Sequence, residues 1–127
     1  MSQTRPVAHQ LEIFESDVHV RVSHDGVELA DSHRQVTLKE GKLPTRYYLP
    51  RSDVRMELLM PVETASHCPF KGDASYWSIE GVPDAAWTYE TPIPGAEQIA
   101  GLVCFYGEKV AVEVVSEPSY PSGSPGR

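Results

Sequence analysis

The stretch "DVHVRVSHDGVELADS", residues 17–32, decides the fold class of this chain. Over residues 18–22 every second residue is a valine and the residues between them are polar, which is the period of a half-buried β-strand. Asp25-Gly26 follows, and this pair favours the positive φ angles of a tight hairpin turn. Residues 27–30 then return as a second strand. The stretch therefore predicts an antiparallel β-hairpin.

The same alternation recurs along most of the chain. Strands are expected in "RQVTLKE" and "TRYYLP". Residues 55–60 are predicted to form another strand, which Pro61 ends, after one helical turn capped by Ser52 or Asp53. No segment keeps a helical period over three turns, although "PGAEQIA" allows one short helical turn. We therefore predict a mainly β protein with about eight short strands. The remaining strands are expected at residues 74–80, 85–90, 101–106 and 109–115.

The two ends of the chain differ from the part between them. Residues 1–10 are expected to form a flexible lead-in. Residues 116–127, "SEPSYPSGSPGR", are rich in Pro, Ser and Gly and cannot bury one face of a core, so we expect a disordered tail. A single compact β domain is then expected over residues 11–115, which suits a chain of 127 residues.

Charge and hydropathy argue against several classes of protein. The chain has 11 basic and 18 acidic residues, a net charge of −7, and gains nothing from the counterion release that drives non-specific nucleic-acid binding. No apolar run approaches the roughly 20 residues of a membrane-spanning helix. The first residues also lack the apolar stretch of a signal peptide. We expect a cytoplasmic protein with no nucleic-acid or membrane partner.

The cysteines and histidines do not form a recognisable metal-binding motif. Cys68 and Cys104 are the two cysteines, and without a C-x-x-C pair the chain lacks a four-cysteine zinc site. The five histidines show no helical i, i+4 pairing. Two cysteines in a cytoplasmic protein are more often free thiols than a disulfide. We expect neither a metal site nor a cofactor.

Reactive side chains concentrate in "TASHCPFKGDASYW", residues 64–77. Cys68 has three functional interpretations, as a nucleophile, a redox thiol or a metal ligand, and one structural interpretation, as a small buried thiol at a strand end. His67 is poorly placed to activate Cys68, because adjacent side chains of a strand point to opposite faces. A strand that ends at Cys68, a turn over residues 69–73 and a return strand that bears Trp77 predict a hairpin. Lys71 lies in its turn, where it is either a solvated cation or close enough to lower the pKa of the thiol.

Two further segments supply groups that suit a ligand. Arg46 can clamp a planar anion, and Tyr48 offers an aromatic face and a hydroxyl; the alternative is an edge-strand pair with one tyrosine in the core. Trp77 and Trp87 belong to a set of aromatic residues on three predicted strands. These aromatics either build a small core or line one concave pocket, where a flat ligand would stack.

Six segments follow one another over about residues 18–115: "VELADS", "RYYLPRSDV", "HCPFKGDASYW", "AAWTYETPIP", "IAGLVCFY" and "KVAVEV". In this order and at these spacings they resemble the bacterial domain-of-unknown-function family 427. The resemblance implies the β-tent architecture, in which two antiparallel sheets lean together at an angle. It also brings a nucleotidyltransferase label, which this sequence does not support, because it has no D-x-D carboxylates to hold Mg²⁺. The zinc-binding relatives use two C-x-x-C knuckles, which this chain lacks.

Three functions remain as alternatives. The leading hypothesis is a pocket for a small, polar, anionic metabolite. Whether the domain also transforms this ligand, as a cofactor-free biosynthetic enzyme, is left open. The second is a thiol enzyme with Cys68 as nucleophile or redox centre, activated by Lys71 or Arg46. The third is a non-catalytic structural or interaction module, and an exposed edge strand would give any of the three a route to homodimers. The expected pocket walls are Arg46, Tyr48, Cys68, Lys71, Trp77 and Trp87.

Overall fold

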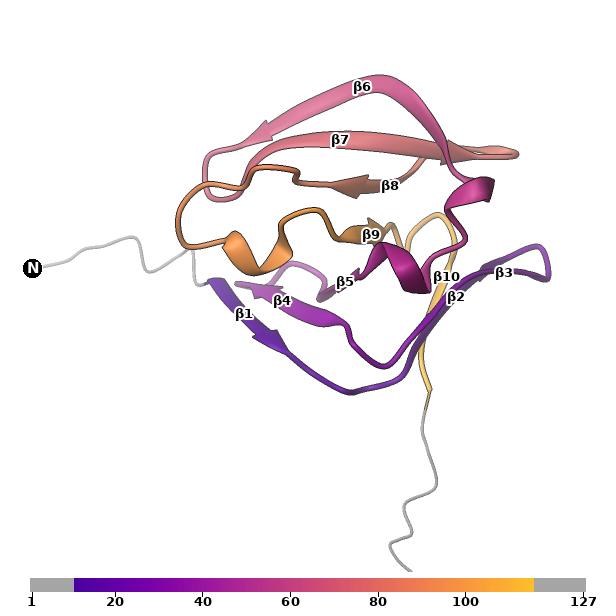
Figure 1. Cartoon of the computed structure of the whole chain (residues 1–127), viewed down its shortest axis with the longest axis horizontal. Coiled ribbons are helices and arrows are strands. Elements are labelled where there is room, and N and C mark those ends of the chain that lie inside the picture. Colours follow the sequence, from indigo (N-terminus) through magenta and orange to yellow (C-terminus); the bar gives the residue numbers. More distant parts are fainter. Residues whose placement is uncertain (1–10, 116–127) are drawn as a thin grey trace, which may run out of the picture.

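The computed structural model describes residues 11–115, which form two antiparallel β-sheets (Figure 1). The mainly β prediction is confirmed, with ten strands in this range where about eight were expected. The predicted lead-in and tail lie outside the described residues. No helix within residues 11–115 has the length and apolar character to cross a membrane. The elements are β1 Leu11–Glu15, β2 Val20–His24, β3 Val27–Ser32, β4 Val36–Glu40, β5 Arg46–Leu49, β6 Met60–Cys68, β7 Gly72–Ile79, β8 Val82–Thr88, β9 Val103–Phe105 and β10 Ala111–Val114, with 3-10 helices η1 Arg51–Asp53, η2 Met56–Leu58 and η3 Glu97–Ile99.

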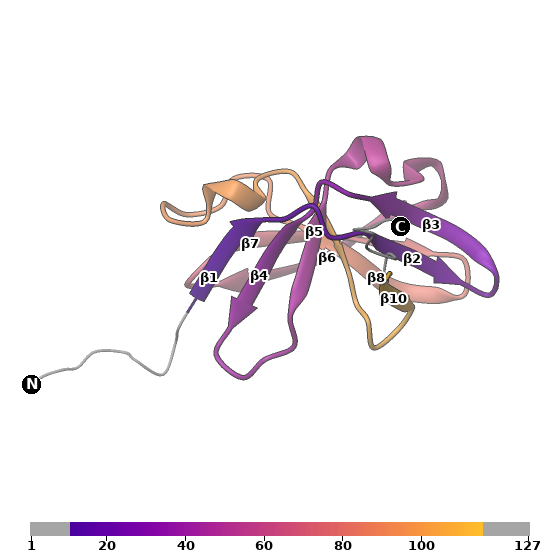
Figure 2. The same ribbon diagram turned by 90° about the horizontal axis from the view of Figure 1, so that it is seen from below.

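The hairpin predicted from residues 17–32 is present as β2 and β3. His24 pairs with Val27, so Asp25 and Gly26 form a two-residue turn. Their φ angles of 53° and 78° are the positive values that such a turn requires. β10 pairs with the other side of β2 and completes a three-stranded sheet, β10-β2-β3, which Figure 2 shows apart from β1 and β4.

The other seven strands form one sheet in the order β1-β4-β5-β9-β8-β7-β6. The sheet curls from β6 to β1 without closing into a barrel (Figure 1). Its β1 edge was not among the predicted strands, although "LEIFE" alternates: Leu11 and Ile13 are half-buried and their neighbours are exposed. The segment pairs along its whole length with β4. A five-residue alternation is too short to predict a strand by itself, and here the pairing with β4 stabilises it.

The large sheet carries a separate core on each face, because successive side chains of a strand point to opposite sides. β5 shows the division: Leu49 faces one core, to which Tyr47 also packs, and Tyr48 between them faces the other. We call the first the inter-sheet core, because it includes residues of both sheets: Val20, Val22, Leu29, Leu49, Trp77 and Phe105 are among its members. The second, the pocket-side core, includes Val36, Leu38, Tyr48, Trp87, Tyr89, Ile99 and Cys104.

The structure corrects the prediction for residues 55–60. Residues Met56–Leu58 form the 3-10 helix η2, and strand β6 begins only at Met60. Pro61, expected to end a strand, lies inside β6 and pairs with Trp77. This position tolerates proline because β6 is an edge strand, whose outer side has no ladder hydrogen bonds to lose.

The β6–β7 hairpin, predicted from residues 64–77, is confirmed, and its turn carries Lys71. Cys68 pairs with Gly72, and the Lys71 N–H donates to the Cys68 carbonyl at 3.1 Å. The Lys71 carbonyl accepts from the Ile93 N–H at 2.9 Å. Gly72 has a φ of +121°, and a Cβ there would lie 3.3 Å from the Cα of Pro92. Only glycine allows the turn to approach the 91–93 segment this closely.

Gly72→Ala is expected to lower the free energy of unfolding by more than the about 1–2 kcal/mol of an unfavourable positive φ alone, since the new Cβ also meets backbone atoms. Gly26→Ala should cost only the backbone part, because its φ is +78° and no heavy atom lies within 4 Å of the Cβ position. Gly107→Ala, at a position without a positive φ, serves as the control. Urea unfolding of the three variants tests this order, and equal losses at Gly72 and Gly26 would contradict it.

Candidate functional site

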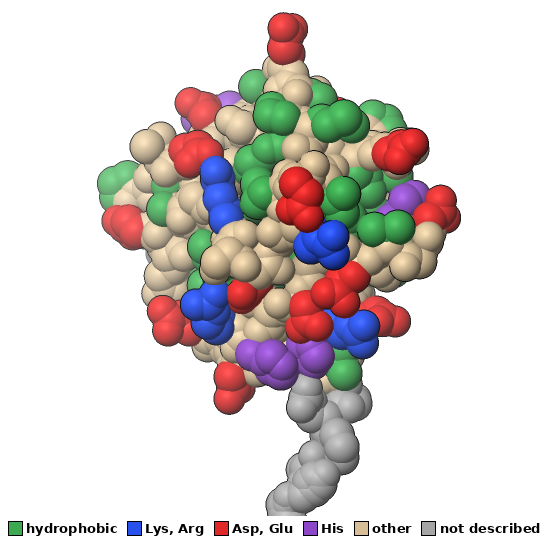
Figure 3. Space-filling model, turned by 45° about the vertical axis from the view of Figure 1, so that its right-hand side comes forward, with side chains coloured by type: hydrophobic (Ala, Val, Ile, Leu, Met, Phe, Trp, Pro, Cys, Tyr) green, Lys and Arg blue, Asp and Glu red, His purple; other side chains and the backbone are tan. Residues whose placement is uncertain are grey.

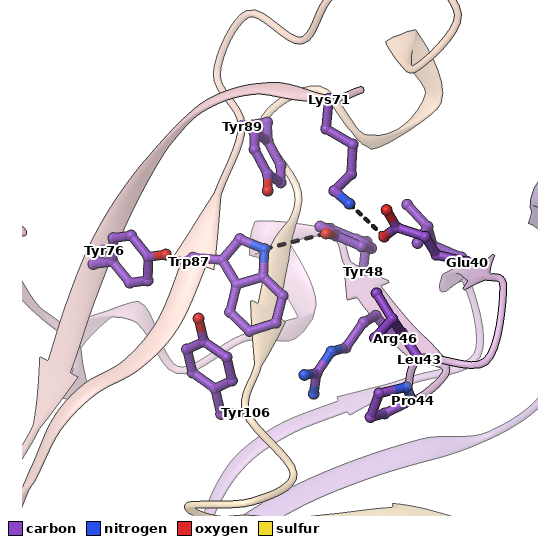
Figure 4. A pocket seen from close by; sticks show the side chains of 11 residues that line it. Glu40, Leu43, Pro44, Arg46, Tyr48, Lys71, Tyr76, Trp87, Tyr89 and Tyr106 are labelled. Carbon is purple, nitrogen blue, oxygen red and sulfur yellow. Dashed lines mark hydrogen bonds and ion pairs between the residues drawn. The ribbon is translucent and has the colours of Figure 1, made fainter. Parts of the chain in front are cut away.

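A row of paired residues crosses the pocket side of the large sheet. Tyr48 on β5 pairs with Cys104 on β9, Cys104 with Trp87 on β8, and Trp87 with Tyr76 on β7. Paired residues point to the same face of a sheet, so this register gathers the aromatic rings. Beside them lies a pocket of about 190 Å³. It is lined by Leu38, Glu40, Leu43, Pro44, Arg46, Tyr48, Lys71, Tyr76, Trp87, Tyr89 and Tyr106 (Figure 4).

Tyr48 and Trp87 form the floor of the pocket. The Trp87 Nε1–H donates to the Tyr48 hydroxyl at 3.1 Å, and the two rings meet edge to face with centroids 6.1 Å apart. Both residues are buried. The hydrogen bond satisfies the buried indole N–H, which would be costly to leave unpaired, and it fixes the position of the Tyr48 hydroxyl. The floor is therefore rigid and has a defined polar point.

Arg46 covers one side of the pocket. Its guanidinium carbon lies 5.3 Å from the ring centroids of both Trp87 and Tyr106, within cation–π distance. Its two terminal nitrogens donate to the two carboxylate oxygens of Glu108, at 3.0 and 3.4 Å. These hydrogen bonds lower the pKa of Glu108. The aromatic faces and Glu108 together hold the cation in one orientation at the pocket wall.

A buried ion pair lies on the opposite side of the pocket, as Figure 4 shows. The Lys71 Nζ donates to Glu40 Oε1 at 2.6 Å, and the side chains are only 10% and 9% exposed. Glu40 ends β4 and Lys71 lies in the β6–β7 turn, so the pair connects strands near the two opposite edges of the curled sheet. Removal of either charge would break the ion pair and leave the other charge buried, which is costly at such low exposure.

Three of the tyrosines that line the pocket, Tyr48, Tyr89 and Tyr106, keep their hydroxyl protons at neutral pH. Burial raises the pKa of Tyr48, of Tyr89 and of Tyr106 above the usual value for a phenol. Protonated phenols donate hydrogen bonds and do not act as bases. The pocket thus offers neutral donors, one guanidinium and one lysine–glutamate pair.

The structure brings together four of the six residues predicted to line a pocket: Arg46, Tyr48, Lys71 and Trp87. The site lies on one face of the large sheet and not between the two sheets. Trp77 is directed into the inter-sheet core, where Arg51 lies 5.1 Å from its ring. The register explains this, since Trp77 pairs with Ala86 while its neighbour Tyr76 pairs with Trp87. Tyr76, and not Trp77, therefore lies beside Trp87.

Cys68 is not among the residues that line the pocket. It is half-buried and packs against the pocket-side core, while the side chain of Lys71 reaches Glu40. His67 is hydrogen-bonded through Nδ1 to the Oδ1 of Asp73, its partner on β7, at 2.7 Å, and the carboxylate oxygen accepts. The nearest histidine in sequence is thus engaged elsewhere.

Sequence reasoning missed Glu40, Tyr76, Tyr89 and Tyr106 as site residues. Tyr76, Tyr89 and Tyr106 belong to the set of aromatic residues on the predicted strands, but the face to which each one points could not be assigned without the register. Glu40, followed by Gly41, has the pattern of a solvated carboxylate at a strand end. Its position in the alternation was the available signal: Val36, Leu38 and Glu40 share one face of β4, and the first two are apolar core residues.

The fold and the pocket define a small β domain with a polar, aromatic-walled pocket on one sheet face. The chain belongs to the family described as Domain of unknown function (DUF427), whose profile matches residues 12–116. The predicted resemblance is thereby confirmed, while the β-tent architecture that it implied stays a prediction. No curated protein matches the chain.

Lys71→Met is expected to lower the free energy of unfolding by about 3–5 kcal/mol, the cost of a buried charge that loses its partner. The double variant Lys71→Met with Glu40→Gln should recover part of that loss, because no buried charge remains. The control is Arg55→Met, which breaks an ion pair of 2.8 Å whose side chains are 55% and 63% exposed. It should cost less than about 1 kcal/mol. Denaturant unfolding of the wild type and the three variants gives these values, and a double variant no more stable than Lys71→Met alone would contradict the interpretation.

The two thiols are expected to differ in reactivity. Cys104 is fully buried, and burial raises the pKa of its thiol, so an alkylating reagent should reach it only after unfolding. Cys68 is partly exposed and should react in the folded protein. Iodoacetamide labelling followed by peptide mass spectrometry distinguishes them. Labelling of Cys104 at the same rate as Cys68 in the folded protein would contradict the burial of that strand.

Proposed function

We propose that the protein binds a small anionic metabolite in the pocket between Arg46 and the Lys71–Glu40 pair. The pocket volume of about 190 Å³ is below the roughly 300–1,000 Å³ of sites for drug-sized ligands. A short carboxylate fits this size better than a nucleotide. The observation that carries the proposal is the placement of Arg46, whose guanidinium carbon lies 5.3 Å from the centroids of two aromatic rings at the wall of a cavity.

The charge of the lining residues supports an anion. Arg46 and Lys71 are positive and Glu40 is negative, so the lining carries a net charge of +1 on a chain whose total is −7. Arg46 is 21% exposed in its ion pair and Glu108 is 56% exposed. A ligand carboxylate can therefore approach the Arg46 guanidinium from the pocket, while Glu108 holds the guanidinium from outside the pocket. Arginine suits this role because its planar fork matches a carboxylate.

The hydroxyl groups of the pocket support an oxygen-rich ligand. Tyr48, Tyr89 and Tyr106 have pKa values raised by burial, so each hydroxyl keeps its proton and can donate a hydrogen bond to a ligand oxygen. Trp87 offers a flat face beside them. An apolar wall with a few fixed polar groups is the usual composition of a small-molecule site.

The chemistry that this pocket supports best is proton transfer without a cofactor. Lys71 and Glu40, in contact at 2.6 Å, are an acid and a base in one buried place. Tyr48, Tyr89 and Tyr106 have raised pKa values and therefore do not supply the base. Within the described part of the chain, Glu40 is the one carboxylate that lines the pocket, and Lys71 engages it. Nucleotidyl transfer depends on clustered carboxylates that hold Mg²⁺, so the pocket does not favour that reaction.

A panel of small anions tests the proposal, with acetate, pyruvate, succinate and inorganic phosphate as probes. At least one carboxylate is expected to raise the melting temperature of the full chain through preferential binding to the folded state. Arg46→Gln should abolish that rise. Arg55→Gln, which removes an arginine from an exposed ion pair outside the pocket, should leave it unchanged. If no carboxylate stabilises the wild type, or if Arg46→Gln responds as the wild type does, the proposed site is wrong.

A spectroscopic readout separates binding in the pocket from binding elsewhere. The chain has two tryptophans, and only Trp87 lines the pocket. In a Trp77→Phe variant the emission comes from Trp87 alone, so a ligand in the pocket should change its intensity or wavelength at the concentrations that raise the melting temperature. Stabilisation without any change in Trp87 emission would place the anion at another site.

A further inference from the structure

The outer face of the three-stranded sheet brings together three metal-ligating side chains that lie far apart in the sequence. Val20 pairs with Ser32 in the β2–β3 ladder, so extending that register by one residue places His19 opposite His33. Asp31 pairs with Arg21 on the same ladder. Val20, Val22 and Ser32 are buried, so the alternation turns His19, Asp31 and His33 outward. Figure 3 shows histidine side chains adjoining acidic ones on this side of the molecule.

The three side chains are already close to one another. The His19 Nε2 lies 2.6 Å from Asp31 Oδ1, and the His19 side chain is only 14% exposed. The His19 and His33 rings stack with centroids 4.0 Å apart and an interplanar angle of 20°. One ligand atom from each residue lies within 4.8 Å of the other two. Tetrahedral zinc bonds of about 2.0–2.2 Å separate the ligand atoms by about 3.4 Å, so modest side-chain rotations would bring the three atoms onto one ion.

The charges around the cluster favour a cation. Arg21 lies 3.7 Å from Asp31 and 3.6 Å from Glu28, and Glu113 on β10 pairs with Arg21. Two carboxylates thus lie within 4 Å of the Arg21 guanidinium, and Glu113 is the neighbour of Arg21 across the ladder, so acidic side chains outnumber the one basic side chain on this face. A divalent metal would take one ligand atom from each imidazole and one from the Asp31 carboxylate.

We propose that His19, Asp31 and His33 bind a divalent transition-metal ion, zinc above all, with water completing the coordination. Imidazole nitrogen and carboxylate oxygen are a donor set that suits zinc, whereas calcium and magnesium prefer oxygen alone. The ion cross-links the start of β2 to the end of β3 and so stabilises the three-stranded sheet. This site shares no residue with the pocket and does not depend on its function.

Calorimetric titration of the full chain, stripped of metal by a chelator and free of any affinity tag, with Zn²⁺ tests the site. One ion per chain is expected, with a rise in melting temperature. His33→Gln and Asp31→Asn should each weaken binding at least about tenfold, since even the outer-shell partners of metal ligands contribute that much. Both positions are exposed, so both variants should fold, which circular dichroism of the metal-free proteins verifies.

A matched control comes from a second histidine–aspartate pair. His67 and Asp73 lie 2.7 Å apart on the β6–β7 hairpin, and neither belongs to a group of three possible ligands within the described residues. His67→Gln should leave the Zn²⁺ affinity unchanged. Co²⁺ gives a second readout, a visible absorption band that should disappear in His33→Gln. Absence of Zn²⁺ binding, undiminished affinity in His33→Gln, or an equal loss in His67→Gln would each overturn the proposal.

Discussion

A single buried ion pair connects the opposite limbs of the large sheet. Glu40 ends β4, next to the β1 edge, and Lys71 lies in the turn before β7, next to the β6 edge. Their contact of 2.6 Å at almost no exposure keeps the sheet curled over one face. Burying two charges carries a desolvation cost that their attraction barely offsets. We therefore understand this pair as a constraint on the curl of the sheet, and thus on the shape of the pocket, and not as a source of stability.

The pocket follows from that curl and from the register of the central strands. Tyr48, Cys104, Trp87 and Tyr76 pair one after another, so their side chains share the concave face. Arg46 stands two residues from Tyr48 on the same strand and lies over Trp87 and Tyr106. The rings exclude water on one side of the guanidinium, and Glu108 holds it on the other. The arrangement makes a cation available in a partly apolar place, where it interacts most strongly with an anion.

Much of the fold could be predicted from local pattern. The alternation before and after Asp25-Gly26 identified β2 and β3. The Asp-Gly pair identified the turn between them, because this pair favours the positive φ angles that both residues adopt. The hairpin that carries Lys71 was also recognisable from its residues. The secondary structure of residues 55–60 was harder to predict, since a short apolar run fits a strand or a 3-10 turn equally well. η2 forms there because the chain has to turn between η1 and the edge strand β6.

By itself the sequence determined the β class, the positions of most strands and the candidates Arg46, Tyr48, Lys71 and Trp87. Only the tertiary structure decided which face each strand turns toward the pocket. The physical reason is the period of two: a shift of register by one residue exchanges every inward and outward side chain, and register is set by contacts between distant segments. That exchange separates Trp77 from Trp87 and brings Glu40 to Lys71. It also places His19 against His33, a pairing that no spacing along the chain reveals.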